Sequence, residues 1–169
     1  MSADRVPVTV EATARAPVET TFDAIVPIDL AAIFTGYGPL PAVTGVREQT
    51  GPWTRAGERR VVQLADGSEA PELLTRVDRP DGFAYVVGPF SGRLAWLVRD
   101  VHGDWCFWGD EAAGTTRIRW TYAFAPRGSL ARAVVRVVLA PLWRRYAEQA
   151  LGRAVRAAEA CVETGGARG

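Results

Sequence analysis

Apolar and polar residues alternate with a period of two along much of the chain, which is the pattern of strands with one buried face. In the first such segment, Val8, Val10 and Ala12 alternate with polar side chains. Gly, Pro or Asp-Gly bounds most of the later segments, and the Asp66-Gly67 pair is typical of a tight hairpin turn. The pattern predicts strands at 6–16, 43–50, 58–66, 69–78, 82–88, 98–109 and 115–125.

Three other segments carry helical signals. Pro17 fits the first position of a helix over 17–26, where its missing N–H costs nothing. Asp29 can cap a short helix over 30–34 by accepting from its free N–H groups. A long helix is predicted over 129–160, with a kink near 137–141 because Pro141 removes one backbone hydrogen bond. Its inner face is predicted to consist of Val135, Leu139, Leu142, Tyr146 and Ala150.

The element order is one strand, two short helices, six strands and a terminal helix. Because antiparallel hairpins dominate this order, it predicts an α+β fold rather than a parallel doubly wound one. A long helix laid across a curved, seven-stranded antiparallel sheet buries both apolar faces and leaves room for an aromatic-lined cavity, a common kind of small-molecule site. We expect one domain over 6–163, with flexible tails at 1–5 and 164–169.

Composition excludes several kinds of chemistry. All 20 basic residues are arginine, so Schiff-base chemistry on lysine and a P-loop are both excluded. The single histidine, His102, cannot build a multi-histidine metal site within one chain, and we expect neither a metal nor a cofactor. A net charge of +1 predicts no affinity for nucleic acid.

Several features predict a soluble, cytoplasmic protein without an integral membrane segment. The chain does not begin with a charged segment followed by an apolar run, and no apolar stretch approaches the roughly 18 residues of a membrane span. Cys106 and Cys161 have neither CxxC spacing nor a disulfide framework, which fits a reducing compartment. Four arginines of the terminal helix are interpreted as a solvated face, with a basic stripe for anionic membranes as the alternative: Arg132, Arg136, Arg144 and Arg145.

The register between the last two strands decides which side chains face the helix. One face of the final strand carries Ile118, Trp120, Tyr122 and Phe124. A turn centred between positions 112 and 113 places Phe107 opposite Ile118 and Trp105 opposite Trp120. We favour this register because it pairs aromatic with aromatic side chains.

In the favoured register, His102, Asp104 and Cys106 point outward as a solvated strand face. A shift of one residue or a β-bulge would turn them inward. An inward imidazole beside Asp104 or Asp100 would be able to abstract an α-proton from a ketone-bearing substrate. The two registers therefore distinguish an apolar pocket from a reactive one.

Three parts of the sequence resemble one group of proteins: APVETTFDAI (16–25), GTTRIRWTYAFAP (114–126) and the terminal helix. Together they are similar to the START-like helix-grip superfamily over about 6–160. The Gly-Thr turn that leads into an alternating aromatic strand is typical of its bacterial polyketide cyclase/dehydrase-like branch. The loops ADGSEA (65–70) and PFSGRL (89–94) lack the gate and latch patterns of the hormone receptors in this superfamily, and the Cys/His motif of its Rieske branch is absent.

The resemblance implies a fold that hosts both carriers and enzymes. It implies an internal cavity that binds a hydrophobic, oxygenated small molecule, in a monomer or homodimer. If the protein is catalytic, the reaction is a cofactor-free aldol cyclisation or dehydration, in which Tyr or Arg donors stabilise the enolate oxygen; no catalytic residue is assigned. A non-catalytic carrier or sensor of lipid-like ligands is the alternative, and a protein-interaction module with a filled core is a third hypothesis. The residues expected to contact the ligand are Tyr37, Tyr85, Trp105, Phe107, Trp120, Tyr122, Phe124, Leu142 and Tyr146.

Overall fold

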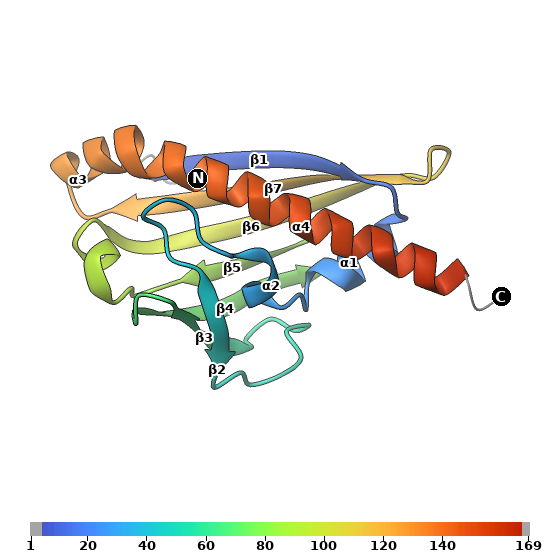
Figure 1. Ribbon diagram of the computed structural model, residues 1–169, viewed down its shortest axis with the longest axis horizontal. Helices are drawn as coiled ribbons and strands as arrows, with labels where there is room; N and C mark the ends of the chain where they lie inside the picture. The colour runs from blue at the N-terminus through green and yellow to red at the C-terminus, as the bar shows by residue number, and fades with distance from the viewer. Residues whose placement is uncertain (1–4, 167–169) are drawn as a thin grey trace.

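A long helix crosses one face of a seven-stranded antiparallel sheet in the computed structural model, which describes residues 5–166 (Figure 1). The spatial order of the strands is β1-β7-β6-β5-β4-β3-β2, so the first and last strands pair at one side of the sheet. This confirms the predicted α+β architecture. The strands are β1 (Val6–Ala14), β2 (Val43–Arg47), β3 (Arg59–Leu64), β4 (Glu69–Asp78), β5 (Gly82–Val87), β6 (Val98–Asp110) and β7 (Thr115–Pro126).

The α-helices lie where the sequence predicts them, in the gap after β1 and after β7, whereas the short 3₁₀-helix between β5 and β6 was not predicted. Asp29 accepts a hydrogen bond from the Ala31 N–H at 3.0 Å and so caps the second short helix, as expected. The predicted tails at 1–5 and 164–169 lie mostly outside the described residues, but the terminal helix continues to Gly166. The helical elements are α1 (Val18–Ile25), α2 (Leu30–Ile33), the 3₁₀-helix η1 (Gly92–Trp96), α3 (Ser129–Val134), the π-helix η2 (Val135–Leu139) and α4 (Ala140–Gly166).

The terminal helix is irregular next to Pro141, close to the predicted kink, and the irregularity is a π-helical turn. The Ala140 N–H bonds to the Val135 carbonyl, five residues back. Because Pro141 has no N–H, the regular i to i−4 ladder cannot pass through this point, and the wider turn accommodates the break. Val135 and Leu139 remain buried on either side of the turn.

The register between β6 and β7 is the favoured one. Phe107 lies opposite Ile118 and Trp105 lies opposite Trp120. The aromatic residues therefore face the helix, and the alternative in which His102 enters the interior is wrong. The side chains of His102 and Asp104 are 52% and 46% exposed on the outer face of the sheet.

Candidate ligand-binding site between the sheet and the terminal helix

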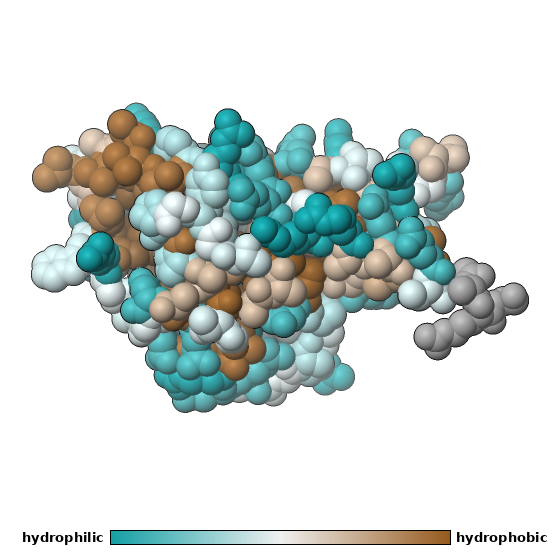
Figure 2. Space-filling view, in the orientation of Figure 1, coloured by the Kyte–Doolittle hydropathy of each residue, from teal (hydrophilic) through white to brown (hydrophobic). Residues whose placement is uncertain are grey.

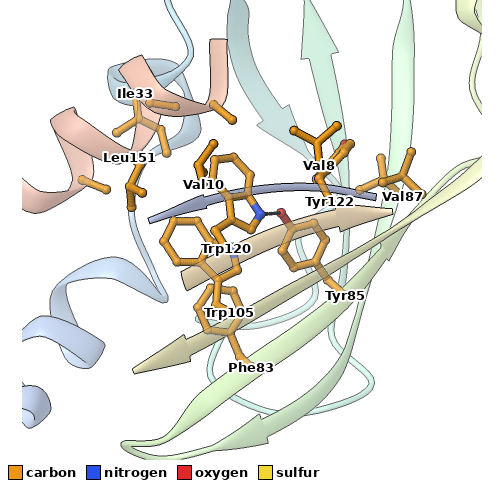
Figure 3. Close-up of a cluster of buried hydrophobic side chains, with 14 of the residues drawn as sticks. Val8, Val10, Ile33, Phe83, Tyr85, Val87, Trp105, Trp120, Tyr122 and Leu151 are labelled. Carbon is orange, nitrogen blue, oxygen red and sulfur yellow. Dashed lines mark hydrogen bonds between the residues drawn. The ribbon is translucent and has the colours of Figure 1, made fainter. Parts of the chain in front are cut away.

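Aromatic side chains from three adjacent strands stack in a row on the inner face of the sheet (Figure 3). Phe83 pairs with Trp105 across β5 and β6, and Trp105 pairs with Trp120 across β6 and β7. Their ring centroids lie 5.5 Å and 4.6 Å apart, with interplanar angles of 12° and 20°. Side chains alternate between the two faces of each strand, and the pairing of β5, β6 and β7 brings three inward-facing residues side by side. All three are aromatic, so their rings stack.

The terminal helix adds Trp143, a residue that the helical periodicity did not identify. Its ring lies 4.2 Å from that of Tyr122 and 6.0 Å from that of Phe34, in stacked geometry with both. Leu142, which was expected on the inner face, is half-buried and is not part of the core cluster. The π-helical turn rotates the following residues, so Trp143 replaces Leu142 against the sheet.

Where the sequence predicts a cavity, the structure places a packed aromatic cluster. Phe107 contacts Phe22 of α1, and Phe124 contacts both Tyr122 and Trp143. Two open grooves lie on the surface beside the start of the terminal helix. A molecule bound between the sheet and the terminal helix would therefore have to displace rings that contact one another here.

The indole N–H of Trp143 is buried and has no hydrogen-bond partner within residues 5–166. A buried donor without an acceptor costs about 1–3 kcal/mol, so proteins rarely keep one without a reason. The ring lies between the helix and β7, next to Tyr122. An oxygen atom of a bound molecule would satisfy this donor.

Tyr85 presents its hydroxyl in the middle of the cluster, above Gly103. The Trp120 N–H donates to the Tyr85 hydroxyl oxygen at 3.1 Å, as Figure 3 shows. Tyr85, Gly103 and Tyr122 are neighbours in one cross-strand row, and the Tyr85 ring occupies the space that a side chain on Gly103 would fill. Since Tyr85 is the acceptor in this bond, its own proton is free to be donated to another oxygen.

A buried ion pair lies on the neighbouring strands β3 and β4. Arg60 and Glu72 are cross-strand partners, and Arg60 Nε donates to Glu72 Oε2 at 2.5 Å. Both side chains are at most 7% exposed. Trp53 covers the guanidinium at 3.8 Å, with a backbone φ of 64° that is rare for a bulky residue. Conformational strain of this kind is frequent at functional sites.

Burial controls the protonation of the interior groups. It raises the pKa of Glu72, although the adjacent Arg60 opposes the change. Burial also raises the pKa of Tyr85, and the negative charge of Glu72 adds to the effect. The pKa of Tyr122 is raised well above its usual value, again mainly by burial. Both tyrosines therefore stay protonated at neutral pH, and each hydroxyl carries a proton that it can donate.

Of two further tyrosines that were expected to contact a ligand, Tyr146 packs against the rings of Phe34 and Trp143, and Tyr37 lies in the loop after α2. The Tyr146 hydroxyl donates to the Pro41 carbonyl at 2.8 Å and accepts from the Gly36 N–H at 3.2 Å, so it attaches the loop after α2 to α4. Burial raises the pKa of Tyr146. Tyr37 is half-buried within this loop, where its backbone pairs with Leu40. Sequence reasoning thus named several aromatic residues of this cluster, but it missed Phe34, Phe83 and Trp143 and did not anticipate the structural use of Tyr146.

The cluster around His102, on the outer face of the sheet, consists of charged and polar groups rather than aromatic rings. Arg5 forms an ion pair with Asp100 at 2.7 Å and lies 2.9 Å from the imidazole Nε2 of His102. Partial burial lowers the pKa of His102, and the positive charge of Arg5 lowers it further, while Asp100 opposes both.

Within residues 5–166, no group of three His, Cys, Asp or Glu side chains forms a metal-binding cluster, and no helix is long and apolar enough to cross a membrane.

Comparisons with solved structures return the same fold. The crystal structure of Ara h 8.0201 matches with a TM-score of 0.65 at 17% identity, covering 95% of this chain and 99% of that one. The ginseng major latex-like protein 151 from Panax ginseng matches with a TM-score of 0.63 at 12% identity, covering 92% and 96%. The protein XoxI from Bacillus cereus gives 0.62 at 14% identity, covering 90% and 94%.

Sequence comparison supplies the family. A search of curated proteins found no match. A family model described as polyketide cyclase / dehydrase and lipid transport matches residues 5–159, which is nearly the whole described chain. The solved structures above share the fold of this chain, a sheet crossed by a long terminal helix. The chain therefore belongs to the polyketide cyclase / dehydrase and lipid transport family of the START-like helix-grip superfamily.

Proposed function

We propose that the protein binds a hydrophobic, oxygen-bearing small molecule between the sheet and α4. The observation that carries this proposal is the buried indole N–H of Trp143, which has no acceptor within the described residues. It lies in an otherwise apolar, aromatic environment that favours a hydrophobic ligand. The family description, which covers both cyclases and lipid transport, supports the same class of ligand.

Oxygen atoms of such a ligand would have two protein donors. The Trp143 N–H is one, and the Tyr85 hydroxyl, which already accepts from Trp120, is the other. Because the pKa of Tyr85 is raised, the hydroxyl remains a neutral donor that can hold a carbonyl or enolate oxygen. Glu72 and Arg60 would supply the charged groups of the site.

The catalytic form of the proposal is a cofactor-free aldol cyclisation or dehydration. Holding a flexible chain folded lowers the barrier by itself, and Tyr85 would stabilise the developing enolate. The carrier form is favoured by a different observation: most of the surrounding contacts are between aromatic rings, with few polar groups. Tyr85→Phe distinguishes the catalytic form of the proposal from the carrier form. In an enzyme it would lower turnover by about tenfold or more, whereas in a carrier it would weaken ligand binding by only a few fold.

The first experiment is native mass spectrometry of the protein purified from its own host. A bound molecule that is released on denaturation, with the mass of an oxygenated hydrophobic compound, is the expected result. Binding of the fluorescent probe anilinonaphthalene sulfonate then tests the site. Trp143→Phe removes the indole donor and is expected to weaken probe binding about fivefold, whereas Trp108→Phe, on the outer face, leaves it unchanged. No bound molecule, together with equal probe binding by the two variants, would refute the proposal.

A further inference from the structure

One end of the molecule exposes large apolar side chains to solvent. Figure 2 shows hydrophobic residues gathered over α3 and the start of the terminal helix. Leu130, Val137 and Val138 are 80%, 72% and 53% exposed, and Trp96 of η1 is 83% exposed. Because Arg127, just before α3, bonds to the carbonyls of Ala95 and Leu97, η1 is attached to the same end. We call these four apolar residues the apolar tip.

The π-helical turn accounts for two of the four tip residues, Val137 and Val138. The segment VVRVVLA (134–140) is apolar at six of seven positions, which is more than one helix face can bury. Val135 and Leu139 enter the core, whereas Val137 and Val138 project outward. Pro141 fixes the turn at this place. Exposed apolar side chains clustered in this way indicate an interaction surface.

Positive charge surrounds the tip without any acidic residue in the same segments. The segments 88–99 and 126–147 contain no Asp or Glu. Both surface grooves that flank the tip are lined by arginines: Arg99, Arg127 and Arg132 line one, and Arg5, Arg136, Arg144 and Arg145 line the other. The second groove also holds one acidic residue, Glu148, which pairs with Arg145. Within residues 5–166, Arg99, Arg127 and Arg136 are exposed and form no ion pair; we call these three the arginine rim. The rim contrasts with the net charge of only +1 for the whole chain.

We propose that the apolar tip and the arginine rim dock the protein on the surface of an anionic lipid bilayer. The apolar residues would enter the boundary between headgroups and acyl chains, and the arginines would pair with lipid phosphates. Trp96 suits this depth because tryptophan prefers membrane–water interfaces. This inference does not depend on the proposed ligand site, since the surface lies on the outside of the molecule.

Charge complementarity favours a bilayer over a second copy of the chain. A symmetric dimer through this patch would place the arginine rim against itself, and like charges across an interface cost free energy. An anionic bilayer would instead pair with all three arginines of the rim at once. The apolar tip also projects from the surface rather than forming a groove that would receive a partner helix.

The test is co-sedimentation with vesicles of phosphatidylcholine, with and without phosphatidylglycerol, at low and high salt. The full chain is expected to bind only the anionic vesicles and to be released by salt. Arg99→Gln and Arg136→Gln should each weaken partitioning about fivefold, and Leu130→Ser and Val137→Ser about tenfold each. Matched controls lie at the other end of the same helix: Arg156→Gln and Val162→Ser should bind as the wild type does.

Three outcomes would overturn the inference. Equal binding to neutral and anionic vesicles would remove the role of the rim. Binding by the tip variants at the level of Val162→Ser would remove the role of the tip. A concentration-dependent dimer in light scattering, lost in Leu130→Ser and accompanied by no vesicle binding, would identify the surface as a dimer interface. Because all substituted side chains are exposed, circular dichroism should show that each variant keeps its fold.

Discussion

Gly103→Ala is expected to be strongly destabilising because the Tyr85 ring lies directly on the glycine. A methyl group at this position would overlap three ring atoms of Tyr85. Moving the ring into a packed interior costs about 1–3 kcal/mol, and losing the hydrogen bond from Trp120 costs about 1 kcal/mol more. The free energy of unfolding should therefore fall by about 2–4 kcal/mol, a large share of the roughly 5–15 kcal/mol of a typical domain.

Urea denaturation of the wild type and four variants measures this effect. Gly45→Ala is the matched control, because the added methyl group there meets only a Gln63 side-chain oxygen at 3.9 Å; stability should stay constant or rise slightly. Tyr85→Ala removes the ring, and in that background Gly103→Ala should cost almost nothing. The expected coupling is about 2 kcal/mol or more. If Gly103→Ala costs the same with and without the ring, the packing of Tyr85 on Gly103 is wrong.

Two further predictions concern charged groups. Glu72→Leu leaves Arg60 buried without its partner, so the free energy of unfolding, measured in urea, should fall by about 3–5 kcal/mol. The double variant Arg60→Met/Glu72→Leu should recover most of this loss. A double variant as unstable as Glu72→Leu would contradict this prediction. His102 is the only histidine, so its NMR titration gives one signal: the pKa should lie below 6.5 and rise in Arg5→Gln. Because the unfolded chain binds this proton more tightly, stability is complete above about pH 6.5 and declines as the pH falls. A pKa that does not respond to Arg5→Gln would refute the assignment.

Strand patterns alone were sufficient to predict much of the fold. The alternation in β6 and β7 fixed their faces, and the choice of register followed from pairing Trp105 with Trp120, which the structure confirms. The stacking of large rings and the length of the turn both favour the same register between β6 and β7, so only one register satisfies both. The same argument correctly predicted that the His102 side chain points outward.

The polar part of the candidate site was harder to predict, for two physical reasons. Arg60 and Glu72 are in phase with the buried residues of β3 and β4, but charged residues are normally exposed, and only their mutual pairing allows burial. Trp53 lies in a loop, where no periodicity indicates which side chain folds inward. A contact between residues far apart in the sequence, such as Arg60 with Glu72, can be identified only once the pairing of the strands is known.

The terminal helix connects the interior with the outer surface through one local irregularity. A regular α-helix advances 3.6 residues per turn, so steps of four residues drift around its axis. The π-helical turn is wider, and the inward positions instead follow Val135, Leu139 and Trp143 in steps of four. The same rotation leaves Val137 and Val138 outside. One break, next to a proline, thus places against the core an indole N–H that has no acceptor within residues 5–166, and it places an apolar pair on the surface. The proposed ligand site and the proposed membrane surface therefore share a structural origin.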